Sequence, residues 1–287
     1  MIRNIAIKNP IIDIVNDISS KWQLSNLRTL VPLSLTNNYV AVAYSAIYKT
    51  DVVLKVLLAN THEPEALMLL NGDICVKLLD YDPATKCMLL EYITPGTTLK
   101  PFFPEEDYKA IEIAADVIKN LHEKNLIPQA KRDDFKTVNQ WLDLLYTFKS
   151  KKIPEWLLEK AKLLATKLLS MPQELYLLHG DLHHENIILK STNSWIVIDP
   201  KGVIGPLEYE VGRFLMNPMP DLLKQPNAKD IIRNRINKFS EIFGFEKQRL
   251  IDWAFAQAIL SVCWAEQGEN EKSFNYFMKF AETIADL

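Results

Sequence analysis

The run His179-Gly180-Asp181-Leu182-His183-His184-Glu185-Asn186 is the most informative stretch of this 287-residue sequence. A few residues later the chain reads Ile196-Val197-Ile198-Asp199-Pro200. Apolar runs flank the first stretch on both sides, at Leu175–Leu178 and Ile187–Leu189, and Ser191–Ser194 is a turn signal before the second stretch. Short apolar runs separated by polar loops and turn residues predict strands. The first stretch should therefore be a loop between strands, and the aspartate of the second should end a buried strand.

The polar residues of these stretches follow the order used for phosphoryl transfer. A kinase places a catalytic aspartate, an asparagine five residues later, and a second aspartate after a strand. The reaction needs an aligned hydroxyl and a charge-neutralising metal, and amide and carboxylate oxygens suit Mg²⁺. We therefore predict that Asn186 and Asp199 bind magnesium, and that Asp181 orients the acceptor hydroxyl and accepts its proton. An isolated Asp and Asn at this spacing would be weak evidence, and the flanking strands strengthen it.

The adjacent His183 and His184 suggest a zinc site at first sight. Neighbouring histidines diverge in direction, however, and no cysteine cluster elsewhere matches them. We expect instead that His179 and His183 are packed, hydrogen-bonded side chains that brace the loop.

These motifs resemble the aminoglycoside phosphotransferase superfamily, and in particular its streptomycin and hydroxyurea resistance kinase branch. The resemblance rests on the run 179–186, on Ile198-Asp199-Pro200-Lys201-Gly202 and on Gly205-Pro206-Leu207-Glu208-Tyr209-Glu210. The Asp-Pro-Lys-Gly form points to that branch, and the similarity extends from about residue 30 to residue 270. It implies that Asp181 is the catalytic aspartate, and it agrees with the two metal ligands predicted above.

The first 93 residues have the pattern of a small sheet. Tyr39–Tyr48 and Val52–Leu58 are β-rich runs joined by a hairpin signal, and Lys77–Leu79 and Met88–Ile93 flank a turn at Tyr81–Pro83. Only Glu63–Leu70 looks helical in this part. We expect an N-terminal, nucleotide-binding lobe over residues 1–93, built on an antiparallel sheet with one helix.

Beyond a hinge at about 91–96 the apolar pattern becomes helical. Tyr108–His122, Ile251–Trp264 and Ser273–Ile284 have helical spacing, and the first of them places five apolar residues on one face: Ile111, Ala114, Ala115, Ile118 and Leu121. Residues 97–287 should form a larger, mainly helical lobe with catalytic and substrate-binding groups. The predicted fold is α+β, two-lobed and protein-kinase-like, with a cleft between the lobes.

Lys55 is the clearest nucleotide-binding candidate of the first lobe. It lies between apolar neighbours in Val52–Val56, where a charged group is costly unless it meets anions such as the phosphates of ATP. Glu63 on the predicted helix would fix its orientation, with Glu65 as the rival acid. The alternative is an edge-strand lysine that reaches solvent.

Two further nucleotide contacts are implied by the resemblance to kinases. The carbonyl of Glu91 and the amide of Ile93 would pair with adenine, unless this is an ordinary strand end. The sequence has no Gly-x-Gly-x-x-Gly loop before Lys55, and the turn Thr36-Asn37-Asn38 stands in its place. Asn38 could cover the phosphates or simply belong to a turn.

The acceptor is expected to be a small molecule. Tyr209-Glu210 follows Asp199 too closely to leave room for the long activation segment of a protein kinase. Glu208 and Glu210 should cap a helix or brace the catalytic loop, rather than bind substrate.

In the resembling family, acidic residues of the helical lobe bind the cationic sugar. Glu266 and Glu269 lie near the end of a predicted helix and are candidates for this role, although acids at a helix end are often only solvated. Trp253 and Trp264 of the same helix are expected to fill core rather than to stack on a ligand.

Composition limits the remaining choices. The net charge is −3 with both signs interspersed, which argues against nucleic acid and anionic membrane surfaces as partners. No apolar run reaches the roughly 18 residues of a membrane span, and the start of the chain lacks a signal-peptide core. Three cysteines without metal or redox spacing fit buried thiols in a reducing compartment, so we expect the cytoplasm. The oligomeric state is not indicated, with a monomer slightly favoured.

Together these patterns predict an ATP- and Mg²⁺-dependent kinase of a small-molecule hydroxyl, on an aminoglycoside-like or other polyol or aminocyclitol acceptor. The alternatives are a kinase of an ordinary metabolite, a nucleotide-binding regulatory module without turnover, and a protein kinase.

Overall fold

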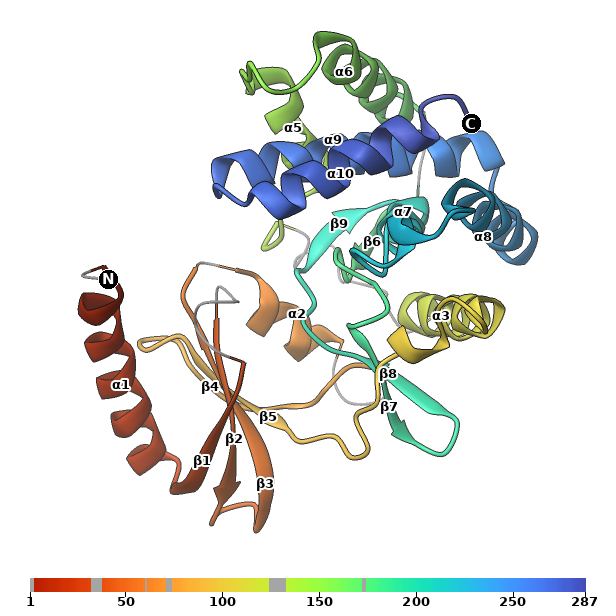
Figure 1. Ribbon diagram of the computed structural model, residues 1–287. Helices are drawn as coiled ribbons and strands as arrows, with labels where there is room; N and C mark the ends of the chain where they lie inside the picture. The colour runs from red at the N-terminus through yellow and green to blue at the C-terminus, as the bar shows by residue number, and fades with distance from the viewer. Residues whose placement is uncertain (1–2, 32–37, 60, 71–73, 124–132, 172–173) are drawn as a thin grey trace. The chain divides into compact units, whose positions relative to one another are not determined.

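The computed structural model describes residues 3–31, 38–59, 61–70, 74–123, 133–171 and 174–287. The chain divides into two compact units, residues 1–95 and residues 96–287 (Figure 1).

In the described part of unit 1, five strands form an antiparallel sheet in the order β1-β2-β3-β5-β4. The strands are β1 (Leu24–Val31), β2 (Asn38–Ser45), β3 (Thr50–Leu57), β4 (Leu78–Asp82) and β5 (Cys87–Glu91). The predicted hairpin is confirmed, since β2 and β3 pair without a register shift and Lys49 adopts a φ of 56° between them. One predicted turn is displaced: the Asp82 carboxylate accepts hydrogen bonds from the amides of Ala84 and Thr85, so β4 continues to Asp82 and the turn follows it.

The start of unit 1 contains a helix that the sequence analysis did not predict. Besides α2 (Glu63–Leu69), which was expected, α1 runs over Arg3–Lys21 ahead of the sheet. Ile11, Val15 and Ile18 recur at helical spacing and are buried. Pro10 lies inside this run, and proline normally ends a helical pattern, which hides the periodicity.

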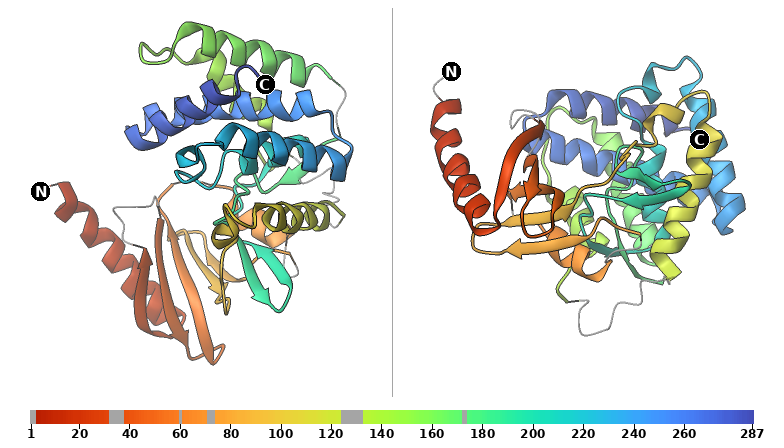
Figure 2. Two further views of the ribbon diagram at one scale, coloured as in Figure 1. Left: turned by 45° about the vertical axis from the view of Figure 1, so that its right-hand side comes forward. Right: turned by 90° about the horizontal axis from the view of Figure 1, so that it is seen from below.

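The two faces of β3 have different partners. Successive side chains of a strand point to opposite faces, and Val52, Leu54 and Val56 pack in one hydrophobic cluster with α1. Figure 2 shows α1 running along the sheet. Lys55 alternates with these residues and meets Glu63 of α2 on the other face. The sheet thus separates the α1 core from the lysine.

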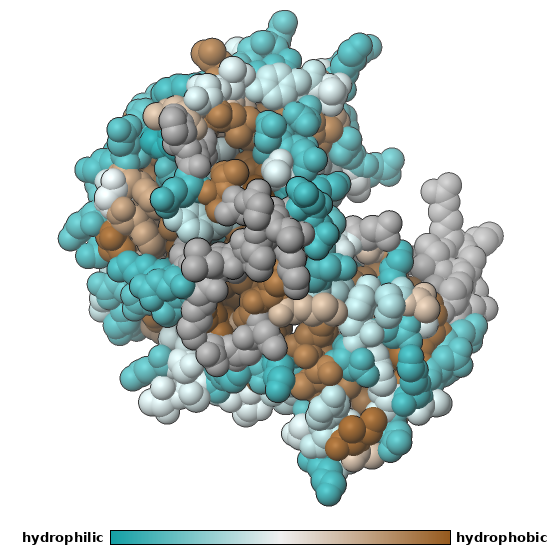
Figure 3. Space-filling model, turned by 180° about the vertical axis from the view of Figure 1, so that it is seen from behind, coloured by the Kyte–Doolittle hydropathy of each residue, from teal (hydrophilic) through white to brown (hydrophobic). Residues whose placement is uncertain are grey.

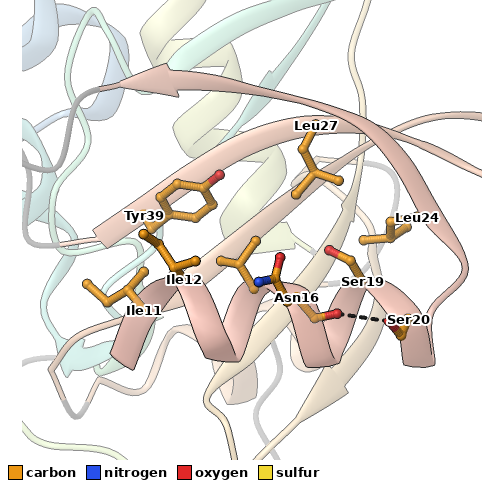
Figure 4. A pocket seen from close by; sticks show the side chains of 9 residues that line it. Ile11, Ile12, Asn16, Ser19, Ser20, Leu24, Leu27 and Tyr39 are labelled. Carbon is orange, nitrogen blue, oxygen red and sulfur yellow. Dashed lines mark hydrogen bonds between the residues drawn. The ribbon is translucent and has the colours of Figure 1, made fainter. Parts of the chain in front are cut away.

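A hollow remains between α1 and the first two strands. It measures about 670 Å³ and is lined by apolar side chains together with Asn16, Ser19 and Ser20. Figure 4 shows Ile11 and Ile12 of α1, Leu27 of β1 and Tyr39 of β2 around this space. It is a gap at the rim of the α1 packing.

Unit 2 is mainly helical, as predicted. Its longer helices include α3 (Asp107–Glu123), α5 (Val138–Thr147), α6 (Glu155–Leu169), α7 (Leu207–Leu215), α8 (Ala228–Phe243), α9 (Lys247–Gln267) and α10 (Glu271–Ile284). The apolar face predicted for α3 is buried throughout. Helix α9 packs against α5, α6, α7, α8 and α10, and Figures 1 and 2 show α9 and α10 side by side. Most of α9 is therefore buried.

Short strand pairs hold the motif loop of unit 2. β6 (Tyr176–Leu178) pairs with β9 (Val203–Gly205), and β7 (Ile187–Ser191) forms a hairpin with β8 (Ser194–Val197). The expected turn of this hairpin is present, with Asn193 at a φ of 61°. The run 179–186 connects β6 to β7, and Asp199 follows β8, as the apolar runs predict.

The burial of the cysteines and the polarity of the surface are those expected from the composition. Cys75, Cys87 and Cys263 are buried, as expected. On the face drawn in Figure 3, hydrophilic residues cover most of the surface and hydrophobic ones show in separate patches. Each helix within the described residues is too short or too polar to cross a membrane.

Candidate active site

The motif loop begins with a turn that only glycine fits well. Gly180 has a φ of 79°, and a Cβ atom there would lie 2.9 Å from Val203 Cγ1 and 3.0 Å from Trp141 Cη2. Its amide donates a 3.0 Å hydrogen bond to Oε1 of the buried Glu210 on α7. The backbone just before Asp181 is thereby fixed from two sides.

His179 ties the loop to the segment ahead of Asp199. Its Nδ1 accepts a hydrogen bond from the Asp181 amide at 3.2 Å, so its Nε2 carries the proton and donates to the Ile198 carbonyl at 2.8 Å. Burial lowers the pKa of His179 to about 4, which keeps the ring neutral. His183 accepts from the Glu185 amide at 3.3 Å. Both histidines brace the loop, as expected.

The structure brings the predicted catalytic residue, Asp181, together with the two predicted metal ligands, Asn186 and Asp199. The side-chain nitrogen of Asn186, Nδ2, donates to the backbone carbonyl of Asp181 at 2.9 Å. The backbone carbonyl of Asn186 accepts from the backbone amide of Ile198, the residue before Asp199, at 3.0 Å. Lys201 Nζ lies 3.7 Å from Asp181 Oδ2 and 4.0 Å from Asp199 Oδ2. The two carboxylates therefore share one cation, and the asparagine is hydrogen-bonded to both chain segments.

Asp199 has an unusual backbone conformation. Its φ is 62°, in the left-handed region that residues other than glycine seldom adopt. Such conformations concentrate at functional sites, where the surrounding structure holds them. Here Pro200 follows directly, and Lys201 donates its amide to the His179 carbonyl at 2.7 Å.

The donor atoms fit a magnesium ion. Since the Asn186 amide nitrogen is engaged, its oxygen is the atom that can bind a cation, and Asp199 offers a carboxylate. Mg²⁺ is commonly held by one or two protein oxygens, with phosphates and water completing the shell. Among the described residues, no cluster of three or more His, Cys, Asp or Glu side chains could hold a metal.

Arg213 was not predicted as a site residue. Its Nε donates to Asp181 Oδ1 at 2.6 Å, and its NH1 donates to the Ser261 hydroxyl of α9 at 3.2 Å. It lies three residues after Glu210 on α7, and that spacing places both on one helix face. This (i, i+3) relation is the sequence signal that could have revealed it.

The charge of Asp181 is set by these neighbours. Burial acts to raise its pKa, but the positive charge of Arg213, with contributions from His183 and Lys201, outweighs burial and holds the pKa well below its usual range. Asp181 is therefore ionised at neutral pH.

The two glutamates of α7 behave differently from each other. Glu210 braces the loop, as expected, and burial raises its pKa to about 8, aided by the nearby charge of Asp181. Glu208 neither caps α7 nor contacts the loop: Arg249 of α9 donates to it at 2.9 Å. Because Glu208 lies two residues from Glu210, the helix turns it to another face.

A buried ionic cluster supports the back of the loop. Arg235 of α8 binds Asp107 of α3 through two hydrogen bonds of 2.9 and 2.6 Å, and it is fully buried. His184 stacks on Phe214 with ring centroids 4.2 Å apart, and its Nε2 lies 3.5 Å from Arg235 NH2. His184 is therefore a third bracing histidine, a role that the sequence analysis assigned only to His179 and His183.

The predicted lysine–glutamate pair of unit 1 is confirmed. Lys55 Nζ lies 2.6 and 2.8 Å from the two carboxylate oxygens of Glu63, and both residues are only 2% exposed. Glu65 is exposed. The alternative of a solvent-reaching lysine is therefore wrong.

The other nucleotide candidates also lie in unit 1. Glu91 ends β5 opposite Val52, and Ile93 follows beyond the strand. Asn38 begins β2, and its side-chain oxygen accepts from the Leu58 amide at 3.4 Å. Thr36 and Asn37 of the predicted turn lie outside the described residues.

The acidic candidates Glu266 and Glu269 lie at the end of α9. They line a cavity of about 450 Å³ together with Asn270, Glu271 and Phe274. The Glu266 Oε2 atom is buried there without a hydrogen-bond partner.

The two tryptophans of α9 differ from each other. Trp253 is fully buried, as predicted. Trp264 is 39% exposed, so the prediction that it fills core is wrong: its ring packs edge-to-face on Trp141 of α5, and this contact leaves part of the indole uncovered.

Comparison with known proteins connects this site to a family. Residues 46–268 match the family described as aminoglycoside/hydroxyurea antibiotic resistance kinase. The streptomycin 3''-kinase of Klebsiella pneumoniae is 30% identical over 163 residues, which cover 55% of this chain and 58% of the relative. The streptomycin 6-kinase of Streptomyces glaucescens is 24% identical over 226 residues, 75% of this chain and 71% of the relative. The crystal structure of aminoglycoside phosphotransferase APH(4)-Ia has the same fold, with a TM-score of 0.69 at 13% identity over 94% of this chain and 96% of that one.

Proposed function

This chain belongs to the aminoglycoside/hydroxyurea antibiotic resistance kinases, and from that premise we propose that it transfers the γ-phosphate of ATP to a hydroxyl group of an aminoglycoside-like or other polyol acceptor. The observation that carries the proposal is the convergence of three side chains: Asp181 and Asp199 share Lys201, and Asn186 is hydrogen-bonded to the backbone of Asp181. Kinase chemistry needs an acid that faces the alcohol and oxygen ligands for a metal, and these side chains supply both.

Asp181 is proposed to act on the acceptor. The hydroxyl oxygen forms a bond to the γ-phosphorus, the bond from that phosphorus to ADP breaks, and ADP leaves with the electron pair. The hydroxyl proton passes to the Asp181 carboxylate. Because Arg213 holds the pKa of Asp181 low, the carboxylate is a weak base. Its main contribution is therefore to align the hydroxyl, which suits a transition state with little bond formation to the nucleophile.

Asn186 and Asp199 are proposed to hold the metal. When bound, Mg²⁺ neutralises charge on the transferred and leaving phosphates. Lys201 lies near both carboxylates and can offset negative charge at the same place. The hydrogen bond from Asn186 to the Asp181 backbone keeps the amide oriented.

The nucleotide itself is proposed to bind through residues of unit 1. Lys55, oriented by Glu63, would meet the phosphates, and Asn38 would lie above them. The backbone groups of Glu91 and Ile93 would pair with adenine. Because the reaction consumes ATP, we propose a cytoplasmic protein.

Streptomycin is the first acceptor to test, because two relatives are named as streptomycin kinases. Glu266 and Glu269 are proposed to receive cationic groups of such an acceptor, since three glutamates outnumber Lys152 in the lining of their cavity and the Glu266 Oε2 atom is buried there without a hydrogen-bond partner.

The deciding experiment is Asp181→Asn, assayed for ADP release with streptomycin and a panel of sugars and cyclitols. We expect kcat to fall by about 10²- to 10⁴-fold, because the carboxylate that aligns and deprotonates the hydroxyl is lost. ATP binding and Tm should stay near those of the wild type. Asp143→Asn, at an exposed position of α5, is the matched control and should retain full turnover.

Normal turnover of Asp181→Asn would remove the proposed role of Asp181. Radiolabel that appears on protein instead of on the small molecule would replace the proposed acceptor class.

A further inference from the structure

Trp264 is an anomaly on α9. Its neighbours Cys263 and Ala265 are buried, and most of the helix lies in the core of unit 2, yet the Trp264 side chain is 39% exposed. Exposed single apolar residues are common on proteins. What distinguishes this one is its position relative to Asp181.

Trp264 is connected to the catalytic loop by packing contacts through a second tryptophan. Trp264 packs edge-to-face on Trp141 of α5, with ring centroids 5.5 Å apart. Trp141 Cη2 in turn lies 3.0 Å from where a Cβ atom would stand on Gly180, the residue before Asp181. The exposed indole is thus two contacts from the loop.

A second set of contacts connects the helix face of Trp264 to the Asp181 carboxylate. Ser261 precedes Trp264 by three residues on α9, a spacing that places the two side chains on one face of the helix. The Ser261 hydroxyl accepts from Arg213, and Arg213 donates to Asp181. Trp264 is therefore connected to Asp181 through Ser261 and Arg213, and its exposed indole lies on the side of α9 that carries these contacts.

We propose that Trp264 is the platform on which the ring of the acceptor packs, with Trp141 as its support. This inference rests on the proposed function and names the part of the acceptor that binds there. A cyclitol or sugar ring offers a face of C–H bonds to an indole, while one of its hydroxyl groups reaches Asp181.

Steady-state kinetics with ATP and streptomycin test this platform. Trp264→Ala should raise the KM for streptomycin by about 5- to 30-fold, the range of aromatic–ligand contacts, and leave the KM for ATP and the Tm unchanged. Trp264→Phe should have a KM for streptomycin between those of the wild type and Trp264→Ala. The control is Trp156→Ala, which removes a 55% exposed tryptophan at the start of α6 and should change nothing. An unchanged KM in Trp264→Ala, or an equal rise in Trp156→Ala, overturns the inference.

A binding measurement separates this inference from the proposed function. Streptomycin should change the intrinsic fluorescence of the wild type, and Trp264→Phe should lose most of that change while Trp156→Phe keeps it. If the wild type transfers no phosphate to any acceptor, the proposed function fails, and the fluorescence alone decides: a change that depends on Trp264 supports the platform, and equal responses in both variants overturn it.

Discussion

The buried pair Lys55–Glu63 shows how one contact can serve function more than stability. Both side chains are almost fully desolvated, and the lysine meets both carboxylate oxygens. Attraction within such a pair roughly offsets the cost of removing two charges from water, whereas loss of one partner leaves an uncompensated charge. The pair is thus a poor source of stability but a precise way to hold an ammonium group in place.

Variants of this pair separate stability from activity. Lys55→Met should destabilise the protein by about 3–5 kcal/mol, because the buried Glu63 carboxylate loses the ammonium group that meets both of its oxygens. The double variant Lys55→Met with Glu63→Met should recover most of that loss, since no buried charge remains. Both should have low turnover because the lysine is gone. Urea unfolding and the ATP assay give the two readouts.

The exposed pair of Arg233 and Asp230 is the matched control. Arg233→Met should change the free energy of unfolding by no more than about 1 kcal/mol. If the double variant of the buried pair were as unstable as Lys55→Met, the stability argument would be wrong.

At the scale of elements, α1 shows what packing adds to a weak helical pattern. Nothing about residues 3–21 singles out a helix strongly, and Pro10 argues against one. The helix nevertheless buries Ile18 and Val15 in the cluster formed with β3 and β5. Tertiary burial, rather than intrinsic propensity, supplies most helix stability in proteins.

Two isoleucines of α1 test this account. Ile18 is 2% exposed and Ile12 is 51% exposed. Ile18→Ala should cost about 2–5 kcal/mol through lost burial and a cavity, whereas Ile12→Ala should stay within about 0.5 kcal/mol of the wild type. Urea unfolding measures both. Equal small effects would mean that α1 does not pack on the sheet.

At the scale of the whole molecule, buried titratable groups of the active-site region should govern the dependence of stability on pH. His179 and His184 have pKa values lowered to about 4 by burial, so their contribution is full above pH 6.5 and is lost as the pH falls toward 4. Glu185 has its pKa lowered to about 2 by its hydrogen bond to His183 and by Lys100, and its contribution is lost below about pH 4. All three groups therefore lower the free energy of unfolding as the pH falls.

Glu210 has the opposite effect on the pH dependence of stability. Its pKa is raised to about 8, so its contribution is full below the ordinary glutamate value of about 4.3 and is lost as the pH rises toward 8. Between pH 6.5 and 8 the histidines no longer change, and the wild type should lose stability as the pH rises. Glu210→Gln keeps an oxygen to accept the Gly180 hydrogen bond and should be flat over that interval. Urea unfolding at four pH values measures the slopes, and parallel curves for the two proteins would refute this role of Glu210.

The sequence by itself determined the local pattern and the order of the chemical groups. The hairpins β2–β3 and β7–β8, the apolar face of α3 and the pairing of Lys55 with Glu63 all follow from spacing between near neighbours. The roles of Asp181, Asn186 and Asp199 remain predictions, but their closeness follows from the two strand pairs that flank their loops.

Only the tertiary structure decided what surrounds those groups. Arg213 reaches Asp181 from 32 residues away and Ser261 from 48 residues away, and Trp264 stays exposed while Trp253 of the same helix is buried. Such contacts depend on which helix faces pack together, and periodicity identifies the apolar side of a helix without naming its partner. The neighbours that set the charge of Asp181 therefore arise from packing between elements; local spacing could place Arg213 on the same helix face as Glu210, but it could not show that Arg213 meets Asp181.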